Sequence, residues 1–248
     1  MTTANGIITE LRKMFPEKLS MEWDNTQGLI AGNASKTIKK VIVSLEFRSN
    51  IPERKADMII LHHPPIFGQK RKITNPFYKE WKHSGEVIYA IHSRMDRAGF
   101  ASRAVAERLF ENSEYKALKT LDDGTIIIEL KKQTQVKEIA KRIKNRLKLK
   151  TVNAIIKKQT VKKIGIHGGE AFQLHHIADA IKENIDLYLG GDMNHHLAEQ
   201  AHAFEASFID IGHFSEQEGM RKLCGVLKRR FPGVRFDYVE QDPLWTIE

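Results

Sequence analysis

Short apolar runs alternate with stretches of helical periodicity along almost the whole chain. Apolar residues recur at helical spacing from Ile7 to Phe15, and Pro16 ends that pattern. Fully apolar runs that predict buried strands lie at 41–43, 58–61 and 87–91, and a small-residue helix is expected at 98–109. Strands that alternate with helices in this way are typical of βαβ units and of a mainly parallel sheet.

The pattern changes near residue 113. Apolar stretches at 116–121 and 125–130 flank Asp122-Asp123-Gly124, and an Asp-Gly pair is a hairpin turn signal. The later predicted elements are helices at 134–147, around 177–181 and at 194–205, and strands at 152–156, 161–166, 187–189, 208–211 and 234–239. We therefore predict an α/β fold of two lobes with mainly parallel or mixed sheets. Residues 1–115 plus 228–248 form the first lobe and residues 116–227 the second.

Composition narrows the class of protein. The 248 residues are 41% hydrophobic and 29% charged, as is typical of a soluble globular protein. The net charge of +9 favours nucleotides, nucleic acid or anionic lipid as partners but says nothing of the fold. Cys224 is the only cysteine of the sequence, which excludes an internal disulfide. The start of the chain lacks a signal-peptide pattern, and no apolar run approaches the about 20 residues of a membrane helix. We expect a cytoplasmic protein with no membrane partner.

Histidines follow several of the predicted strands directly. His62-His63, His92, His167 and His213 each come after an apolar run. Because ligands of open α/β sheets bind beyond the carboxyl ends of the strands, these imidazoles could converge on one site. The alternative for any single histidine is a ring that faces solvent or caps a helix. That alternative is weakest for His62 and His63, because the two prolines that follow hold this pair in a rigid turn.

Two carboxylates lie at helical spacing from these histidines. Asp96 follows His92 by four residues and Glu216 follows His213 by three, so each pair shares one helical face. Asp96 could otherwise cap a helix or face solvent, and Glu216 could be an ordinary first-turn carboxylate. Mixed nitrogen and oxygen donors suit Zn, Fe, Mn or Ni. The set of candidate ligands is His62, His63, Asp96, His213 and Glu216. Five protein ligands are too many for one catalytic metal but suit two metals about 3.5–4 Å apart. The expected site lies between the lobes, at the carboxyl ends of the strands.

Five segments of the sequence resemble a known family. Residues 22–32, EWDNTQGLIAG, resemble the WDNxGLxxG opening of the NIF-three-like family, whose members are also known as GTP cyclohydrolase 1 type 2 homologues. Segments similar to its HHP-x-F, YxxHTxLD, TGD-x-x-(Y/H)-H and DxGH motifs lie at 61–67, 89–96, 190–196 and 210–213. They occur in the family's order from residue 22 to 219, so the resemblance spans most of the chain.

The resemblance implies a two-lobed α/β fold and a ring-shaped homohexamer with its metals facing the interior. It also implies two divalent ions per chain (Zn, Fe, Mn or Ni), held by His62, His63, Asp96, His213 and Glu216. The family usually spaces its last histidine and glutamate four apart, and here Gln217 holds that position, so Glu218 stays the alternative to Glu216. Glu46 stands near where members carry Leu-Asp, which implies an acidic group that is kept but displaced. His167 stands where members more often have a small residue or cysteine.

The resemblance favours a metal-dependent hydrolase that acts on a nucleotide or related phosphate compound, similar to GTP cyclohydrolase. Metal coordination would activate water, and His92 or His196 would move protons as the acid or base. The sequence has neither a Gly-x-x-x-x-Gly-Lys-Ser/Thr loop nor a Gly-x-Gly-x-x-Gly fingerprint. Gly168-Gly169 and Gly190-Gly191 could admit a phosphate at a helix N-terminus or simply form tight turns.

Two other classes of function remain. Residues 131–150 carry nine basic side chains and one acidic one, and four lysines follow at 157–163. Such a basic 131–163 segment could bind a nucleic-acid backbone without sequence preference, or be a solvated lysine-rich face. No aromatic residue lies among the lysines of 131–150, so base stacking is not indicated. The third class is a metal-binding scaffold or metal chaperone without turnover.

Overall fold

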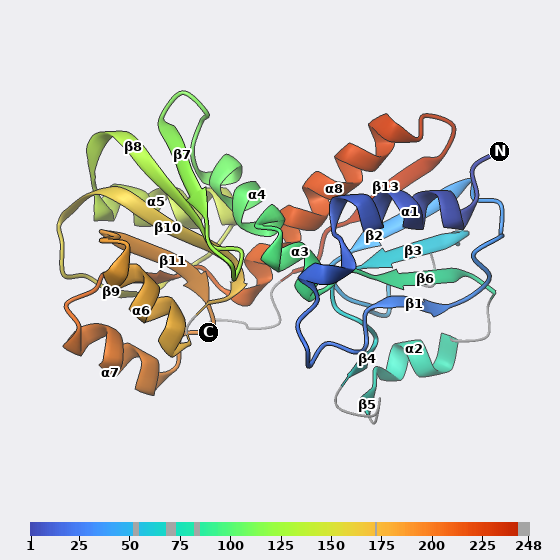
Figure 1. Cartoon of the computed structure of the whole chain (residues 1–248), viewed down its shortest axis with the longest axis horizontal. Helices are drawn as coiled ribbons and strands as arrows, with labels where there is room; N and C mark the ends of the chain where they lie inside the picture. The colour runs from blue at the N-terminus through green and yellow to red at the C-terminus, as the bar shows by residue number, and fades with distance from the viewer. Residues whose placement is uncertain (52–54, 68–72, 82–84, 172, 243–248) are drawn as a thin grey trace. The chain divides into compact units, whose positions relative to one another are not determined.

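The structure, a computed structural model, describes residues 1–51, 55–67, 73–81, 85–171 and 173–242 (Figure 1). Within that part the chain forms two compact α/β units, as predicted. The first unit comprises Met1–Ala98 and Met220–Asp242, and the second begins at Gly99 and includes Gly219. The predicted divisions after residues 115 and 227 lie further along the chain than these two crossings. Residues 243–248 of the predicted first lobe lie outside the described part.

The first unit is built on a five-stranded sheet with the strand order β1–β6–β3–β2–β13. Its strands are β1 (Gly28–Ala31), β2 (Lys40–Ser44), β3 (Met58–Leu61), β6 (Val87–Ala90) and β13 (Arg235–Val239). Neighbouring strands are parallel except for β1, which is antiparallel to β6. Strands β3 and β6 are buried at every residue, which accounts for their uninterrupted apolar sequences.

Helices and a small hairpin complete this unit. They are α1 (Ala4–Met14), η1 (Glu17–Leu19), β4 (Ile66–Phe67), β5 (Ile73–Thr74), α2 (Pro76–Trp81) and α3 (Ser93–Arg97), while α8 (Gln217–Arg230) starts just before the crossing at Met220. The Thr3 hydroxyl accepts a hydrogen bond from the amide of Gly6 and so caps α1. The helix buries Ile7, Ile8 and Leu11, the stripe that the sequence predicted.

The second unit has a six-stranded mixed sheet with the order β7–β8–β10–β11–β12–β9. Its strands are β7 (Tyr115–Thr120), β8 (Ile126–Gln135), β9 (Asn153–Ile155), β10 (Thr160–Glu170), β11 (Leu187–Gly191) and β12 (Phe208–Asp210). Its other elements are α4 (Phe100–Leu109), α5 (Val136–Leu147), α6 (Leu174–Lys182), α7 (His195–Ala203) and η4 (His213–Glu216). The hairpin predicted at the Asp-Gly pair is β7–β8.

Alternate residues of this sheet pack against two separate helix layers. Ile164 and Leu187 lie in one buried cluster with residues of α4 and α5, while Tyr188 lies in another with residues of α6 and α7. This alternation follows from the period of two along a strand. Because residues of α4 lie in the first of these clusters, α4 belongs to the second unit. The helix predicted at 98–109 is α4, which begins at Phe100 because Gly99, with a φ of 64°, separates it from α3.

Among the described residues, no helix has the length and hydropathy needed to cross a membrane.

Candidate metal centre

Three histidines meet at the carboxyl edge of the first unit's sheet. His62 and His63 directly follow β3, and His92 follows the neighbouring parallel strand β6. The amide of His92 donates to the carbonyl of His62 at 3.1 Å. The rings of His62 and His63 have centroids 4.6 Å apart, and each lies 5.6 Å from that of His92. The expected convergence of these three imidazoles is therefore present within the unit.

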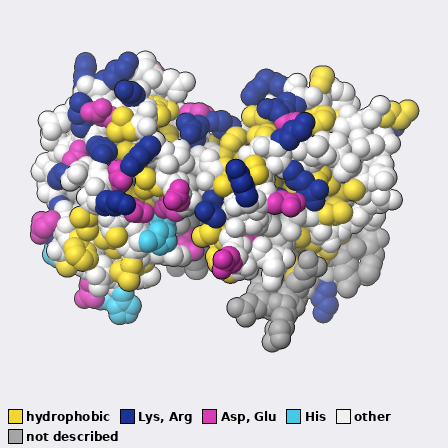
Figure 2. Space-filling model, in the orientation of Figure 1, with side chains coloured by type: hydrophobic (Ala, Val, Ile, Leu, Met, Phe, Trp, Pro, Cys, Tyr) yellow, Lys and Arg dark blue, Asp and Glu magenta, His cyan; other side chains and the backbone are white. Residues whose placement is uncertain are grey.

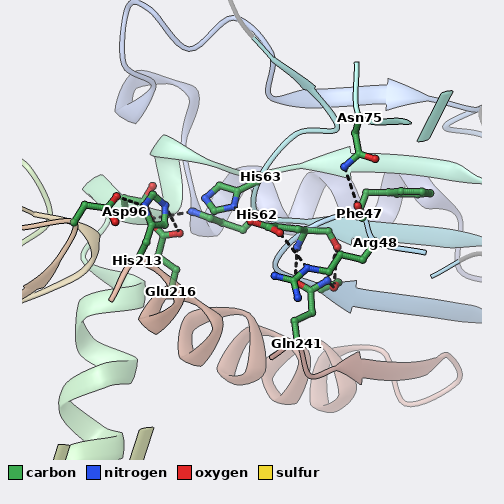
Figure 3. Close-up of polar contacts among 12 residues, drawn as sticks. Phe47, Arg48, His62, His63, Asn75, Asp96, His213, Glu216 and Gln241 are labelled. Atoms are coloured by element: carbon green, nitrogen blue, oxygen red, sulfur yellow. Dashed lines mark hydrogen bonds and ion pairs between the residues drawn. The ribbon is translucent and has the colours of Figure 1, made fainter. Parts of the chain in front are cut away.

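Asp96 joins this cluster from α3. Its Oδ1 lies 3.5 Å from Nε2 of His62, whose side chain is fully buried (Figure 3). The N-cap of α3 is His92, so Asp96 does not cap this helix. The unit thus gathers imidazole nitrogens and a carboxylate oxygen, a donor set suited to Zn, Fe, Mn or Ni.

Glu46 orients His63. Its Oε1 lies 3.4 Å from Nδ1 of His63, and its Oε2 accepts a hydrogen bond from Arg48. The hydrogen bond from His63 lowers the pKa of Glu46, and the Arg48 charge lowers it further, although burial opposes both. With Nδ1 directed to a carboxylate, His63 keeps Nε2 for another partner, as metal-binding histidines commonly do.

Asp24 does the same for His92. Its Oδ2 lies 2.9 Å from Nδ1 of His92 and accepts hydrogen bonds from the amide and hydroxyl of Ser93 at 3.2 and 2.6 Å. Burial raises the pKa of Asp24, but these hydrogen bonds and the charge of His92 outweigh it and lower the pKa overall. The φ of His92 is 41°, a strained value that is typical of functional sites. Exposed Trp23 meets the ring edge-on at 5.5 Å.

The second unit repeats this pattern at His213. Its Nδ1 lies 2.5 Å from Asp192 and its Nε2 lies 3.2 Å from Oε2 of Glu216, which is 4% exposed. Burial lowers the pKa of His213, but the charge of Glu216 and the hydrogen bonds to both carboxylates outweigh it and raise the pKa to about 11. The carboxylates therefore favour a cation at this position, either an imidazolium or a metal ion bound to Nε2.

Two further predicted residues lie apart from this arrangement. Glu218, the alternative to Glu216, lies 3.9 Å from the guanidinium of Arg108. The side chain of His196, on α7, is 91% exposed and lies 3.9 Å from Glu199. The roles of both stay predictions.

A second group of candidate metal ligands lies wholly within the second unit. The ligand atoms of Asp123, His167 and His176 all lie within 4.8 Å of one another. His167 was expected directly after a strand, but β10 continues to Glu170 because its final residues still pair with β11, so His167 lies inside the strand. The sequence had singled out His167 but gave no signal that joined it to the other two.

Sequence reasoning also missed the carboxylates that orient the histidines. Asp24 lies in the segment 22–32 and Asp192 in the segment 190–196, so both stood in recognised motifs without an assigned role. The position of Glu46 beside His63 fits the acidic group that the resemblance implied to be kept but displaced.

Two α/β units with histidine–carboxylate groups at the ends of their strands define a class of candidate metal-binding protein. The chain belongs to the Duf34/NIF3 (NGG1p interacting factor 3) family, whose model matches residues 2–243. It is 28% identical to a "GTP cyclohydrolase 1 type 2 homolog" of Clostridium perfringens, over 91% of both chains. It is 25% identical to "NIF3-like protein 1" of Drosophila melanogaster, over 98% of this chain and 88% of that protein.

Solved structures share the fold. The Staphylococcus aureus protein SA1388 matches with a TM-score of 0.85 and 20% identity, over 99% of both chains. Reduced HcgD from Methanocaldococcus jannaschii matches with a TM-score of 0.80 and 23% identity, over 97% of this chain and 98% of that one. At these identities the likeness establishes the two-unit α/β fold, which confirms the fold class predicted from the sequence.

Proposed function

We propose that the protein holds two divalent metal ions and hydrolyses a nucleotide or related phosphate compound. The ligands in this proposal are His62, His63 and Asp96 of the first unit with His213 and Glu216 of the second. The names of the bacterial relatives, GTP cyclohydrolase 1 type 2 homologs, support a guanine nucleotide as the first substrate to test.

The observation that carries the proposal is the pairing of ring nitrogens with carboxylates. Nδ1 of His63 lies beside Glu46 and Nδ1 of His213 beside Asp192, and Nε2 of His213 faces the carboxylate of Glu216, a second ligand in this proposal. Such carboxylates fix the tautomer and raise the basicity of a metal-ligating histidine. The donor set therefore fits divalent transition metals, which when bound supply Lewis acidity and lower the pKa of a water ligand to about 7.

In this proposal His92 moves the proton. Asp24 holds its Nδ1 and so leaves Nε2 to accept a proton from the attacking water or to return one to the leaving group. The hydrogen bonds from Ser93 fix Asp24 in turn, so the orientation of the imidazole does not depend on solvent. His196, with its exposed side chain, has no comparable support among its described contacts.

Metal content tests the proposal first. We expect His63→Ala and Glu216→Ala each to lower the metal content of purified, reconstituted protein by up to two equivalents per chain, because each removes a ligand and weakens the centre. Plasma mass spectrometry measures this directly. His202→Ala, an exposed histidine on α7, is the matched control and should keep the wild-type content. If both ligand variants keep it too, the proposed centre is wrong.

Turnover separates a hydrolase from a metal-binding scaffold. His92→Gln should keep its metal but lower hydrolysis of the best substrate, with GTP screened first, by about 100-fold or more, as for loss of a general acid or base. Metal without turnover of any nucleotide or phosphate ester would leave the scaffold as the function.

A second candidate function rests on the exposed face of α5. Lys137, Lys141 and Lys144 recur there at helical spacing, whereas the opposite stripe of the helix is buried. The lysines at 157–163 are different, because several are paired with acidic groups, as Lys162 is with Glu129 at 2.9 Å. In Figure 2 the Lys and Arg side chains over the visible face of the second unit are interspersed with Asp and Glu. A nucleic-acid interface would therefore centre on α5.

Charge reversal tests this interface. If the three α5 lysines contact phosphates, raising the salt from 50 to 200 mM should weaken binding to a duplex oligonucleotide by about 40-fold through these contacts alone. Lys137→Glu/Lys141→Glu/Lys144→Glu should abolish binding in fluorescence anisotropy, whereas Lys13→Glu/Lys18→Glu in the first unit should bind normally. Equal binding by both variants would exclude α5.

A further inference from the structure

We infer that Asp123, His167 and His176 form a separate mononuclear site for a divalent transition metal, with zinc as the probe ion. The three residues come from the β7–β8 turn, from β10 and from the first turn of α6. All belong to the second unit, and none is among the ligands of the centre proposed above. The site therefore neither depends on that centre nor extends it.

Burial and spacing carry this inference. His167 is 5% exposed, His176 is 3% exposed, and the side chain of Asp123 is 14% exposed. Nε2 of His176 lies 3.2 Å from Oδ2 of Asp123. Neighbouring donors in a tetrahedral zinc site lie about 3.3 Å apart, given zinc–ligand bonds of about 2.0–2.1 Å. Two of the three ligands thus already have the right separation, and small side-chain rotations bring the third, within 4.8 Å, to the same distance.

The hydrogen bonds around His167 fix its tautomer. The Thr125 hydroxyl donates to Asp123 at 2.9 Å, and the Tyr188 hydroxyl lies 2.7 Å from the Thr125 oxygen. Because the Thr125 proton is used on Asp123, its oxygen accepts from Tyr188 and from Nδ1 of His167, 3.2 Å away. Nε2 of His167 then carries the lone pair that a metal needs. A histidine whose other nitrogen donates to a fixed oxygen is the usual arrangement at a metal.

His176 has to give up one hydrogen bond when the metal binds. Its Nδ1 accepts from the amide of Gln173 at 3.2 Å, as part of the cap of α6, so its Nε2 donates a proton to Asp123. For a metal ion to bind Nε2 of the neutral ring, the ring's single proton has to move from Nε2 to Nδ1, so the bond from the Gln173 amide is lost and the ion takes the place of the hydrogen bond to Asp123. One capping bond is a small loss beside three metal–ligand bonds. Two histidines and one aspartate leave a position open to water, a donor set that zinc and non-haem iron both accept.

Zinc binding in a background without the proposed dinuclear centre tests the site. His62→Ala/His63→Ala serves as the background, and Asp123→Asn or His176→Gln is added to it. We expect each addition to remove one equivalent of zinc per chain, measured by plasma mass spectrometry after dialysis. The visible absorption of bound Co²⁺ should fall in parallel, because tetrahedral cobalt absorbs more strongly than the hydrated ion. Zinc should also raise the unfolding temperature of the background protein but not of the Asp123→Asn protein.

Matched controls separate this site from adventitious binding. Asp122→Asn changes the exposed neighbour of Asp123, and His195→Ala/His196→Ala removes the surface histidine pair on α7. Neither should change the zinc content of the background. The inference is overturned if the background protein binds no zinc, or if its zinc is lost with the α7 pair and kept in Asp123→Asn. Failure of the dinuclear proposal would instead show as an unchanged metal content in the background itself.

Discussion

Gly169→Ala should destabilise the second unit and remove metal from the proposed dinuclear centre. A Cβ at this position would lie 1.8 Å from Oε1 and 2.5 Å from Cδ of Glu216, so the carboxylate has to move. The φ of Gly169 is 101°, which side chains other than glycine rarely adopt and which costs about 1–3 kcal/mol when strained. Because Glu216 is 4% exposed, its displacement also disturbs the ion pair with His213. We expect a total loss of about 3 kcal/mol or more.

Urea unfolding and metal analysis of the same preparation check this expectation. The matched control is Gly225→Ala, in α8, where a Cβ would meet only a guanidinium nitrogen of Arg229 at 3.7 Å. That change should stabilise the protein by about 0.5–1 kcal/mol, because glycine is unfavourable within a helix. A Gly169→Ala protein with the wild-type midpoint and metal content would contradict the packing of Glu216 against this glycine.

The sequence was sufficient where one local pattern decides the outcome. The apolar runs that became β3 and β6 could only be buried strands, and their carboxyl ends had to share an edge once the sheet was parallel. The meeting of His62 and His63 with His92 follows from that rule alone. The stripes of α1 and α5 were equally plain, because each buries one face and exposes the other.

The remaining features depend on contacts between distant parts of the chain. Asp24 reaches Ser93, 69 residues away, and no local pattern marks an aspartate that orients a histidine. Strand β1 was missed because its apolar residues, Leu29 to Ala31, lie between two glycines and none of them is fully buried. The break at Gly99 was missed because helical periodicity continues through it. Asp123 was assigned to a turn, correctly, yet its place beside His176 depends on how the β7–β8 hairpin packs near α6.

Lowering the pH from 7 to 4 should reduce the free energy of unfolding of the metal-free protein by about 3 kcal/mol, because His167 is buried as a neutral imidazole. Burial lowers the pKa of this imidazole and the charge of His176 lowers it further, while Asp123 and Glu216 oppose them, and the result is a pKa of about 4. The unfolded chain has the ordinary value of 6.5. Between pH 6.5 and pH 4 the unfolded state binds a proton that the folded state does not. The contribution of His167 to stability is therefore fully present above pH 6.5 and is lost as the pH falls towards 4.

The pKa shifts of nearby groups show which of them also titrate between pH 4 and pH 6.5. Burial raises the pKa of Asp123, but its hydrogen bonds outweigh that effect and lower the pKa, so its contribution is lost only below its usual 3.8. His213, with a pKa raised to about 11, loses its contribution above pH 6.5 instead. Partial burial and the charge of His176 lower the pKa of His175, which therefore adds a loss of the same sign.

Urea midpoints measured in chelator at pH 7, 6, 5 and 4.5 isolate His167 when the wild type is compared with His167→Gln. His167→Gln keeps an N–H donor for Thr125 but cannot titrate, so its stability should change far less over this range, even if it is lower at pH 7. His202→Gln should follow the wild type, because its imidazole is exposed. An unchanged slope in His167→Gln would mean that other groups take up the proton and that the imidazole is not held neutral inside the unit. If the slope of stability against pH becomes smaller in His167→Gln but not in His202→Gln, the loss of stability in acid comes from the burial of the neutral His167 ring. His202 is the control because it is also an imidazole but is exposed.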